Sequence, residues 1–330
     1  MSPSISTLDH RFSVAPMLDW TDRHCRYFLR LLSKKAVLYT EMVTTGAIIF
    51  GKGDYLSFHP HEHPLVLQLG GSKPEDMARC AIIAQQRGYN ELNINVGCPS
   101  DRVKNGSFGA CLMAEPKVVA ECVSAMKDSV DIPITVKCRI GIDDMDDDEG
   151  LTNFVEPIVA AGCEHFIVHA RKAWLQGLSP KENREVPPLN YERVYRLKAQ
   201  FPDIQISING GIKSLKEAQG HLALVDGVML GREVYTNPYL LSEVDQVIYH
   251  SSENVISRQE VLEQMTDYMR EQISNGSKAW HIARHTLGLF QGQPGGKVWR
   301  RFLSQHAPKE RENPYLLEMA FEAVQNSLNK

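Results

Sequence analysis

The chain has 330 residues, of which 43% are hydrophobic and 23% are charged, and its formal net charge is -4. A chain of this length can hold one domain of about 250 residues and a smaller second one, and its composition excludes a disordered or fibrous protein. The net charge by itself argues against nucleic acid as a partner, although a sum over the whole chain conceals any local patch.

The beginning of the chain, Met1 to Phe12, contains no apolar run, and no later stretch approaches the roughly 20 apolar residues of a membrane span. We therefore expect neither a signal peptide nor a membrane anchor. The seven cysteines are scattered and form no CxxC pair, a pattern typical of reduced thiols in the cytosol. The sequence thus predicts a cytoplasmic protein, without disulfides or a zinc site.

Short apolar runs rich in β-branched residues recur along the first three quarters of the chain. In order they are Phe12–Leu18, Val37–Val43, Leu65–Gly71, Glu91–Gly97, Ile134–Gly141, His165–Arg171, Gln205–Gly211 and Gly227–Arg232. Several are almost continuously apolar, as strands buried on both faces are. Eight strands alternating with helical patterns predict an α/β fold of the (β/α)8 TIM-barrel class. A doubly wound sheet is the structural rival, and the eight-fold count favours the barrel.

Helical patterns fill the gaps between these strands. Lys73–Gly88 has Ser72 as its predicted N-cap, Pro74 in the first turn and a glycine at its end. Pro116–Ser129 and Ser214–Leu224 have the same character. These segments predict the outer helices of the barrel.

The alternation ends near Val247, and Tyr249–Ser257 is polar and resembles a linker. Four segments with helical spacing follow, namely Gln259–Ile273, His281–Phe290, Val298–Gln305 and Pro314–Leu328. We therefore expect a catalytic barrel over residues 1–247 and a helical bundle over 248–330.

The carboxyl ends of barrel strands carry functional residues, and here those ends are polar. The ends of the last two strands read Asn209-Gly210-Gly211 and Gly231-Arg232. Loops after strands seven and eight form the common phosphate pocket of barrels, and these residues offer close backbone approach and a fixed cation. The alternative is that the glycines are ordinary turn residues.

Three further strand ends carry chemically versatile residues. Lys137 can act as a Schiff-base nucleophile, an anion clamp or a flavin partner, and the alternative is a solvated charge. His169 can be functional or a hydrogen-bonded structural histidine. Cys98 follows an apolar strand between Gly97 and Pro99. A lone cysteine is usually inert packing, but at a strand end a protonated thiol can serve as an acid.

Two other clusters contain residue types that bind metals, but their positions and spacing argue against metal sites. His59, His61 and His63 alternate in a proline-containing loop before the third strand, at the end of the barrel away from catalysis. Asp143 to Glu149 contains six acidic residues but lacks EF-hand spacing. We expect a solvated loop in the first case, and in the second a loop that leads into a helix N-terminus.

The segment from Lys278 to Arg311 is basic, with seven lysines and arginines against a single glutamate, a net charge of +6. The other 296 residues therefore carry -10. Trp280, Phe290, Trp299 and Phe302 interleave with these charges. Such a strip fits contact with phosphate backbone, and the aromatic side chains can serve either base stacking or the bundle core.

One long motif carries a family resemblance. LNINVGCPSDRVKNGSFGA, from Leu92 to Ala110, resembles the signature of the tRNA-dihydrouridine synthases. SVAPMLDWTDRHCR and HARKAWLQGLSPKENRE are similar to the branch of that family that modifies positions 20 and 20a. The likeness extends from Phe12 to the C-terminus.

This resemblance implies a barrel that binds FMN, a helical domain that helps to hold tRNA, and NADPH-dependent reduction of uridine to dihydrouridine in the D-loop. Hydride from flavin N5 would reach C6 of the uracil, and Cys98 would protonate C5. The implied FMN-binding residues are Pro16, Met17, Leu18, Gln68, Lys137, His169, Asn209, Gly210, Gly211, Gly231 and Arg232. The candidates for contact with tRNA are Asn95, Arg139, Lys181, Arg184, Lys297, Arg300 and Arg301.

Two other functions stay open from the sequence. The first is a flavin barrel that acts on a small molecule such as a dihydropyrimidine or dihydroorotate, against which the basic C-terminal segment argues. The second is an RNA-binding protein without catalysis, which would bind no flavin. We expect no metal and no stable protein partner.

Overall fold

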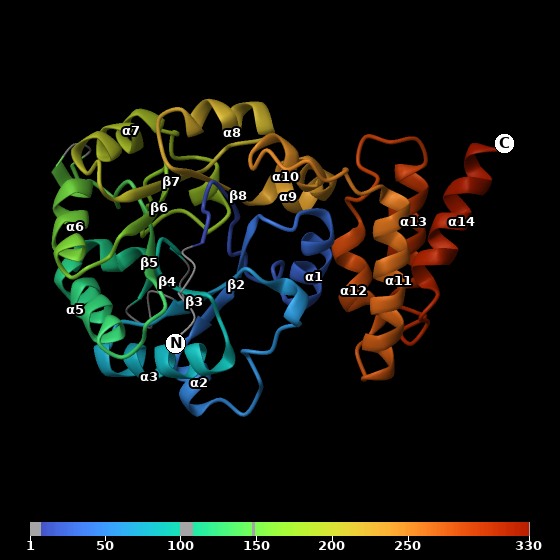
Figure 1. Ribbon diagram of the computed structural model, residues 1–330, viewed down its shortest axis with the longest axis horizontal. Helices are drawn as coiled ribbons and strands as arrows, with labels where there is room; N and C mark the ends of the chain where they lie inside the picture. The colour runs from blue at the N-terminus through green and yellow to red at the C-terminus, as the bar shows by residue number, and fades with distance from the viewer. Residues whose placement is uncertain (1–7, 100–107, 147–148, 330) are drawn as a thin grey trace.

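The computed structural model describes residues 8–99, 108–146 and 149–329. Eight parallel strands close into a barrel in chain order, so that β8 pairs with β1 (Figure 1). They are β1 Phe12–Val14, β2 Val37–Thr44, β3 Leu65–Gly70, β4 Glu91–Val96, β5 Ile134–Arg139, β6 His165–His169, β7 Gln205–Asn209 and β8 Gly227–Leu230. The (β/α)8 prediction is confirmed. Every predicted strand begins at the expected residue, and all but β2 end earlier, because the residues that follow, many of them glycines, lie outside the sheet.

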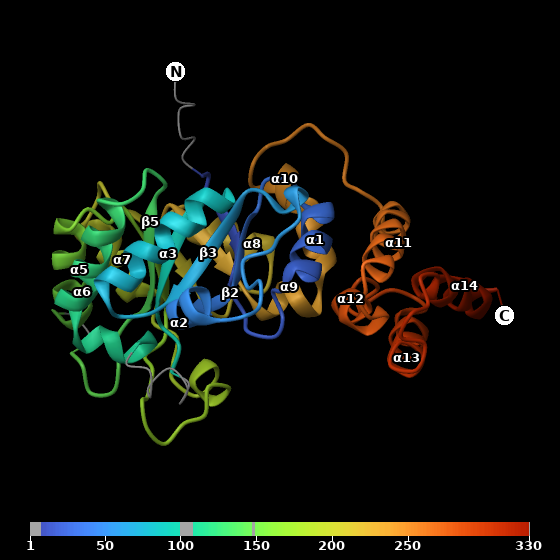
Figure 2. The same cartoon turned by 90° about the horizontal axis from the view of Figure 1, so that it is seen from below.

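Helices surround the strands, as Figures 1 and 2 show. They are α1 Arg23–Leu32, α2 Thr45–Phe50, α3 Pro74–Arg87, α5 Pro116–Lys127, α6 Glu149–Ala160, α7 Tyr191–Gln200, α8 Leu215–Leu222, α9 Arg232–Thr236 and α10 Val244–Val247. Short 3-10 turns are η1 Pro60–Glu62, η2 Gly109–Ala114, η3 Glu182–Arg184 and η4 Pro238–Glu243. The prediction of Ser72 as N-cap of α3 is wrong. Pro74 is the first helical residue, so Lys73 occupies the cap position and makes no side-chain capping bond.

The interior of the barrel is divided between apolar and polar side chains. An inner apolar cluster consists of Ala15, Val37, Tyr39, Val66, Ile167 and Met229. Because alternate residues of a strand face inward, the strands β4 and β5 instead present a polar series: Glu91, Asn93 and Asn95 on β4, and Thr135, Lys137 and Arg139 on β5. The larger hydrophobic core lies between the strands and the outer helices. This division places polar side chains inside the barrel, below the opening at the carboxyl ends of the strands, here called the mouth.

Four helices follow the barrel and lie beside α1 and α9 (Figures 1 and 2). They are α11 Arg258–Ser274, α12 Ala279–Thr286, α13 Gly296–His306 and α14 Leu316–Leu328. The linker-like segment before α11, Tyr249–Ser257, is not exposed along its whole length. Tyr249 is buried, and its hydroxyl donates to the carbonyl oxygen of Phe12 (3.0 Å) and accepts from the backbone N–H of the same residue (3.1 Å). The link between barrel and helices is therefore anchored to the first strand.

Over the described ranges, no helix is both long enough and apolar enough to cross a membrane. All seven cysteines lie in these ranges as thiols.

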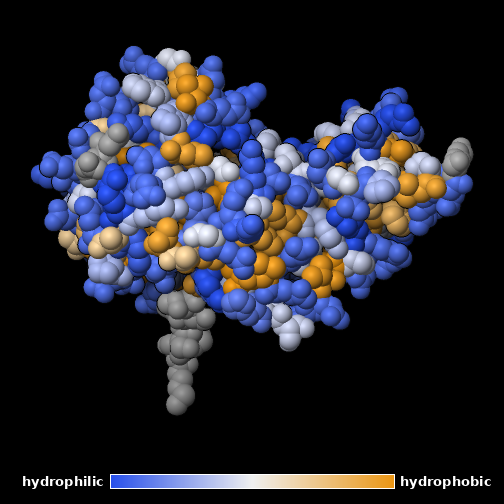
Figure 3. All heavy atoms as spheres, turned by 90° about the horizontal axis from the view of Figure 1, so that it is seen from above, coloured by the Kyte–Doolittle hydropathy of each residue, from blue (hydrophilic) through white to orange (hydrophobic). Residues whose placement is uncertain are grey.

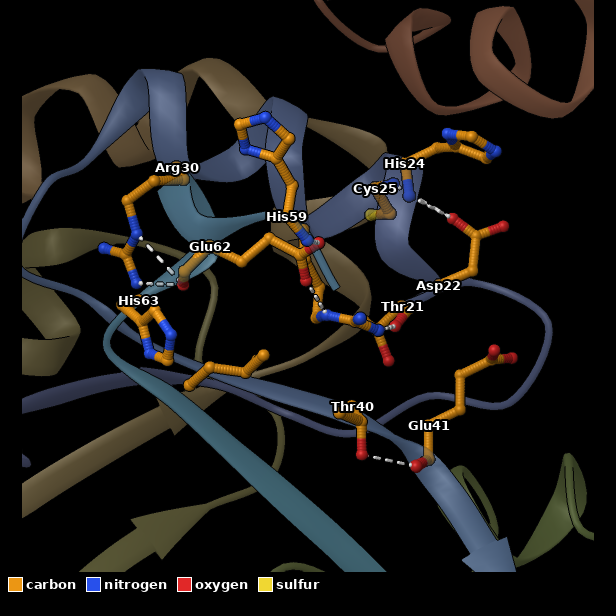
Figure 4. A network of polar contacts seen from close by, with 12 residues as sticks. Thr21, Asp22, His24, Cys25, Arg30, Thr40, Glu41, His59, Glu62 and His63 are labelled. Carbon is orange, nitrogen blue, oxygen red and sulfur yellow. Dashed lines mark hydrogen bonds and ion pairs between the residues drawn. The ribbon is translucent and has the colours of Figure 1, made fainter. Parts of the chain in front are cut away.

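Helix α1 joins the barrel to the C-terminal helices. Its N-cap, Asp22, accepts hydrogen bonds from the backbone N–H groups of His24 and Cys25, both at 3.0 Å (Figure 4). The same carboxylate pairs with Arg284 (2.6 Å) and His285 (3.0 Å) of α12. Burial raises the pKa of Asp22, but these partners outweigh burial and hold that pKa well below its usual range. One carboxylate thus caps a helix and fastens a second helix to it.

Aromatic contacts extend this seam along α1. The Tyr268 hydroxyl of α11 hydrogen-bonds His24 Nδ1 at 2.8 Å, and the Tyr268 ring stacks on Tyr27 at 3.8 Å between centroids. Burial lowers the pKa of His24 to about 4, so this ring is neutral at pH 7. The last turn of α1 is held by Arg30, which donates to the backbone oxygen of Glu62 (3.2 Å; Figure 4).

The histidine loop before β3 makes local structural contacts. His59 caps η1, and its ring accepts from the backbone N–H of His61 (3.1 Å). His63 hydrogen-bonds Asn90 (2.6 Å), and the rings of His59 and His63 lie apart in Figure 4.

The acidic segment also behaves as expected where it is described. Asp146 accepts from the backbone N–H of Glu149 (2.7 Å), at the start of α6. Asp147 and Asp148 lie outside the described residues, as do positions 100–107 of the motif from Leu92 to Ala110.

Candidate active site at the mouth of the barrel

The loop that carries Cys98 is fixed by the residues beneath it. Asn95 Oδ1 accepts from the backbone N–H groups of Gly97 (3.2 Å) and Cys98 (3.0 Å). Arg139 Nε on the neighbouring strand donates to the Gly97 carbonyl oxygen at 2.9 Å. The Cys98 residue is half-buried at the carboxyl end of β4. The structure thus places Cys98 at the mouth, on a loop whose backbone is hydrogen-bonded to Asn95 and Arg139.

Arg139 ties two loops together. Its Nη1 donates to the carbonyl oxygens of Lys172 (3.0 Å) and Asn183 (2.9 Å) in the loop after β6. Only 3% of Arg139 is exposed, and burial lowers the pKa of its guanidinium to about 10, with Arg184 and Arg171 lowering it further. Arg139 and Asn95, predicted to contact substrate, are thus both engaged with backbone groups of the mouth loops.

Lys137 lies one inward position below Arg139. Its Nζ donates to Asn209 Oδ1 on β7 (3.2 Å), and Asn209 Nδ2 donates to the Met229 carbonyl oxygen on β8 (2.7 Å). Burial lowers the pKa of Lys137 to about 8, and the charge of Arg139 adds to this effect. Burial and the same cations also lower the pKa of His169, at the end of β6, well below its usual range. The mouth therefore holds a lysine that still carries its charge at pH 7 beside a neutral histidine.

The turn after β7 can be built only from residues without a side chain. Gly210 and Gly211 have φ angles of 117° and 74°. A Cβ on Gly210 would lie 2.7 Å from His169 Cδ2, and one on Gly211 would lie 2.8 Å from the Tyr191 hydroxyl. Gly210 is therefore required by the packing of the buried turn against His169, whereas the backbone of Gly211 is exposed.

The end of β8 lies next to this turn in the sheet. A Cβ on Gly231 would meet Met17 Sδ at 3.5 Å, so the loops after β8 and β1 are neighbours. Arg232 pairs with Glu185 (2.7 Å) and donates to the Arg184 carbonyl oxygen (3.3 Å). The loop after β6 thus reaches across to the predicted phosphate end.

Cations crowd this mouth. Arg232 lowers the pKa of both Arg171 and Arg184, after the larger effect of burial. Such mutual repulsion is relieved by an anion, and the electrostatics favour a phosphate or a polyanion here. Lys181, at the start of η3, is exposed on the same loop.

The remaining predicted flavin contacts differ in exposure. Leu18 is 58% exposed, whereas Pro16 and Met17 are half-buried. Gln68 is only 1% exposed, and both ends of its amide are engaged, with Asn95 Nδ2 (2.8 Å) and Asn93 Oδ1 (2.8 Å). The structure thus brings the ends of β1, β3, β5, β6, β7 and β8 to one mouth, with Gln68 lowest.

The basic segment of the C-terminal helices divides into exposed charges and buried rings. Lys297 and Arg301 on α13 are exposed, and Arg300 is half-buried with a hydrogen bond to Gln291. Trp299 is fully buried and donates from Nε1 to the Thr286 carbonyl oxygen (2.9 Å). Of the two roles open for the aromatic side chains, Trp299 and the buried Phe290 serve the bundle core.

The outline of the molecule is hollowed between the mouth-side loops of the barrel and the C-terminal helices, and hydrophilic residues border this hollow (Figure 3). Exposed lysine and arginine side chains lie on the loop after β6 and on α13. Figure 1 shows α1 and α9 between these two elements.

Several residues of the site were not found from the sequence. Asn183 and Tyr191 belong to the mouth through their contacts, but no role was predicted for either; Asn183 lies within the motif HARKAWLQGLSPKENRE, and Tyr191 starts a helix. Arg171 ended the predicted strand His165–Arg171 but was assigned no role. Glu91 and Asn93 carried a signal, since ELNIN alternates polar and apolar residues and so gives β4 a polar inner face.

The chain is similar to known proteins over nearly its whole length. Residues 13–328 match the family described as Dihydrouridine synthase (Dus). A tRNA-dihydrouridine(20/20a) synthase of Shewanella oneidensis is 61% identical over 321 residues, which cover 97% of this chain and 96% of that protein. Proteins of the same name from Vibrio parahaemolyticus and Escherichia coli K12 are each 60% identical, with 97% and 95% of this chain and 98% and 91% of those proteins covered.

Among solved structures, a 2-naphthoyl-CoA reductase in complex with 2-naphthoyl-CoA is similar, with a TM-score of 0.53 and 11% identity. The match covers 72% of this chain and 50% of that one, and it concerns the fold alone.

Proposed function

The chain belongs to the dihydrouridine synthase family of flavin-dependent oxidoreductases, and from this premise we propose that it reduces uridines in the D-loop of tRNA, at positions 20 and 20a, with FMN as cofactor and NADPH as reductant. The observation that carries the proposal is the mouth itself, where Asn95 and Arg139 hold the backbone of the Cys98 loop beside a group of cations. An anionic cofactor and an anionic polymer are the ligands that such a mouth attracts.

The residues at the strand ends fit FMN. Gly210 forms the turn with Gly211, whose exposed backbone would allow close approach, and Arg232 would supply a charge suited to the phosphate. Lys137 and His169 would face the polar edge of the ring system, with Pro16, Met17, Leu18 and Gln68 on the side of β1 and β3. When bound in its reduced form, FMN supplies the hydride that adds to C6 of the pyrimidine.

Lys137 would keep negative charge at that edge neutralised. With a pKa near 8, its Nζ is protonated at pH 7 and donates hydrogen bonds. Its contact with Asn209 fixes the Nζ position from β7, two strands away in the barrel. The neutral His169 then donates or accepts without adding a second cation.

Cys98 would deliver the proton that completes the reduction at C5. C5 gains enolate character once C6 is saturated, because the C5–C6 bond is conjugated to the C4 carbonyl, and a general acid must protonate it. A thiol carries a hydrogen that it can donate. Asn95 and Arg139 would hold the loop in place and help to orient the uracil edge.

We further propose that residues 248–330 form a domain that holds the tRNA against the mouth. The target base must leave the RNA stack, which costs a few kcal/mol, and contacts to the phosphate backbone offset that cost. Lys181 and Arg184 from the loop after β6 would contact the RNA from one side, and Lys297, Arg300 and Arg301 on α13 from the other. Such an enzyme acts where tRNA is processed, in the cytoplasm.

The test is a comparison of cysteine variants with purified protein, an unmodified tRNA transcript, FMN and NADPH. Cys98→Ala is expected to bind FMN and tRNA as the unsubstituted protein does and to lose about 10²- to 10⁴-fold in the rate of dihydrouridine formation, measured by mass spectrometry of nuclease digests. Cys111→Ala is the matched control, because Cys98 and Cys111 are the two half-buried cysteines of the chain. Full activity of Cys98→Ala would overturn the proton-donor role. Reduction of free pyrimidines but not of tRNA would point to a small-molecule reductase, and protein unable to bind FMN would point to an RNA-binding protein.

A further inference from the structure

A continuous series of hydrogen bonds runs down the inside of the barrel from the Cys98 loop to the opposite end. Its members are Asn95, Gln68, Asn93, Thr135, Glu91 and His10, here called the polar column. All six are at least 90% buried. They come from β3, β4, β5 and the residues before β1, so no single segment of sequence contains the column.

The upper half of the column supports the catalytic loop directly. Asn95 Oδ1 accepts from the backbone N–H of Cys98 at 3.0 Å, and Asn95 Nδ2 donates to Gln68 Oε1 at 2.8 Å. Gln68 Nε2 then donates to Asn93 Oδ1 at 2.8 Å. Each amide therefore points its oxygen toward the mouth and its nitrogen toward the bottom of the barrel.

The lower half favours the same direction from the other end of the polar column. Asn93 Nδ2 donates to Thr135 Oγ1 (3.0 Å), and that hydroxyl has two acceptors around it, Glu91 Oε1 (2.8 Å) and the Leu92 carbonyl oxygen (3.1 Å). A hydroxyl has one hydrogen, and both of these oxygens can only accept. Thr135 must therefore donate to one of them and accept from Asn93. The other oxygen of Glu91 is held by His10 Nε2 at 2.7 Å.

A reversed column would break the catalytic loop. If Asn93 turned its oxygen toward Thr135, its nitrogen would face Gln68, and the reversal would pass through Gln68 to Asn95. Asn95 would then present N–H groups to the N–H groups of Gly97 and Cys98, so donors would face donors. Buried donors without acceptors are unfavourable, and aligned amide dipoles strengthen whichever direction is set.

We propose, on the basis of the function proposed above, that Thr135 is a positioning residue for the reaction. Its hydroxyl sets the orientation of three amides and thereby the position of the Cys98 thiol, although Thr135 touches neither cofactor nor substrate. Glu91 assists as one of the two acceptors that fix the hydroxyl. The Thr135 hydroxyl, two hydrogen bonds below Gln68 in the polar column, thereby positions the acid at the mouth.

Three variants test this inference, all in the full-length protein loaded with FMN. Thr135→Val keeps the volume and removes the hydroxyl, whereas Thr135→Ser keeps the hydroxyl and removes a methyl group. Ser207→Ala removes a different buried hydroxyl inside the same barrel, one that hydrogen-bonds His165 at 2.8 Å and is not part of the polar column. Thermal unfolding of each variant reports its folding, and Asn93→Leu cuts the column one link higher if Thr135→Val does not fold.

Two measurements are made on each variant. The first is hydrogen exchange of the Gly97 and Cys98 amides, which needs no tRNA and no turnover. The second is the steady-state rate of dihydrouridine formation, separated into kcat and the KM for tRNA. Thr135→Val is expected to exchange these two amides at least about tenfold faster and to lose on the order of tenfold to a hundredfold in kcat with little change in KM. Thr135→Ser and Ser207→Ala are expected to behave as the unsubstituted protein.

The inference is overturned if Thr135→Val leaves the exchange of the Gly97 and Cys98 amides unchanged, or if Ser207→Ala reproduces its effects. A failure of the proposed function has a different signature: the unsubstituted protein would make no dihydrouridine, while the exchange measurement would still decide the role of Thr135.

Discussion

The ion pair between Asp22 and Arg284 should fasten the C-terminal helices to the barrel, and a double-mutant cycle measures its contribution. Asp22→Asn retains an N-cap side chain for α1, because asparagine caps helices as well as aspartate does. It removes the charge that meets Arg284 at 2.6 Å. Arg284→Met removes the partner while keeping most of its packing volume.

The magnitude follows from how exposed the pair is. The side chains of Arg284 and Asp22 are 29% and 22% exposed. Fully exposed pairs contribute about 0.2–1 kcal/mol, whereas breaking a fully buried pair costs about 3–5 kcal/mol. We therefore expect a coupling free energy of about 1–3 kcal/mol, with His285 adding to the loss in Asp22→Asn because it donates to the same carboxylate.

Urea unfolding followed by tryptophan fluorescence is the assay. Trp280 and Trp299 lie in or beside the C-terminal helices, and Trp299 is fully buried, so its emission reports loss of their core. The cycle compares the two single variants, the double variant and the unsubstituted protein. A coupling below about 0.5 kcal/mol would refute the reasoning, because it would mean that apolar packing of α1 against α11 and α12, and not this pair, holds the helices.

The stability of the same seam should also depend on acid pH. His24 has a pKa lowered to about 4, so the unfolded chain binds its proton first as pH falls below about 6.5, and the seam should lose stability between pH 6.5 and 4.

Three further predictions concern the mouth and the RNA surface. Burial lowers the pKa of Lys137 to about 8, so its charge is lost as pH rises, and FMN affinity measured by fluorescence quenching should fall about tenfold from pH 7 to pH 9. Lys137→Met should bind FMN more weakly, with an affinity that does not change with pH. An affinity independent of pH in the unsubstituted protein would contradict this prediction. Gly210→Ala should weaken FMN binding at least about tenfold, because its Cβ would lie 2.7 Å from His169 Cδ2; Gly177→Ala, also at positive φ but with nothing within 4 Å, is the control and should bind FMN normally. Lys297→Gln should reduce the slope of log affinity for tRNA against log salt by about 0.7–0.9, and an unchanged slope would remove this residue from the RNA surface.

The strands and the polar residues at their ends were predictable because each depends on a local pattern. A strand buried on both faces must be apolar along its length, and a strand-end residue is recognisable from where that run stops. Cys98, Lys137, His169 and Arg232 were found in this way. Boundaries were less secure, as the misplaced cap of α3 shows, because a proline in the first turn and a serine before it give competing start signals.

The roles of aromatic and basic residues in the C-terminal helices could not be assigned from composition. Trp299 and Phe290 interleave with arginines in the sequence, yet they turn into the bundle core while Lys297 and Arg301 stay outside. Helical periodicity predicts that one face is apolar, but it does not say which neighbouring helix covers that face.

The succession of strands along the chain, the fold class that it requires and the residue types that reach the mouth follow from local patterns in the sequence. Contacts between segments far apart in the chain arise only when the chain folds. Asp22 meets Arg284 across 262 positions, and Thr135 lies 42 positions from Asn93 in the polar column. Hydrogen bonds join atoms about 3 Å apart, and closure of the barrel brings those atoms together, whereas a linear pattern records only their spacing along the chain.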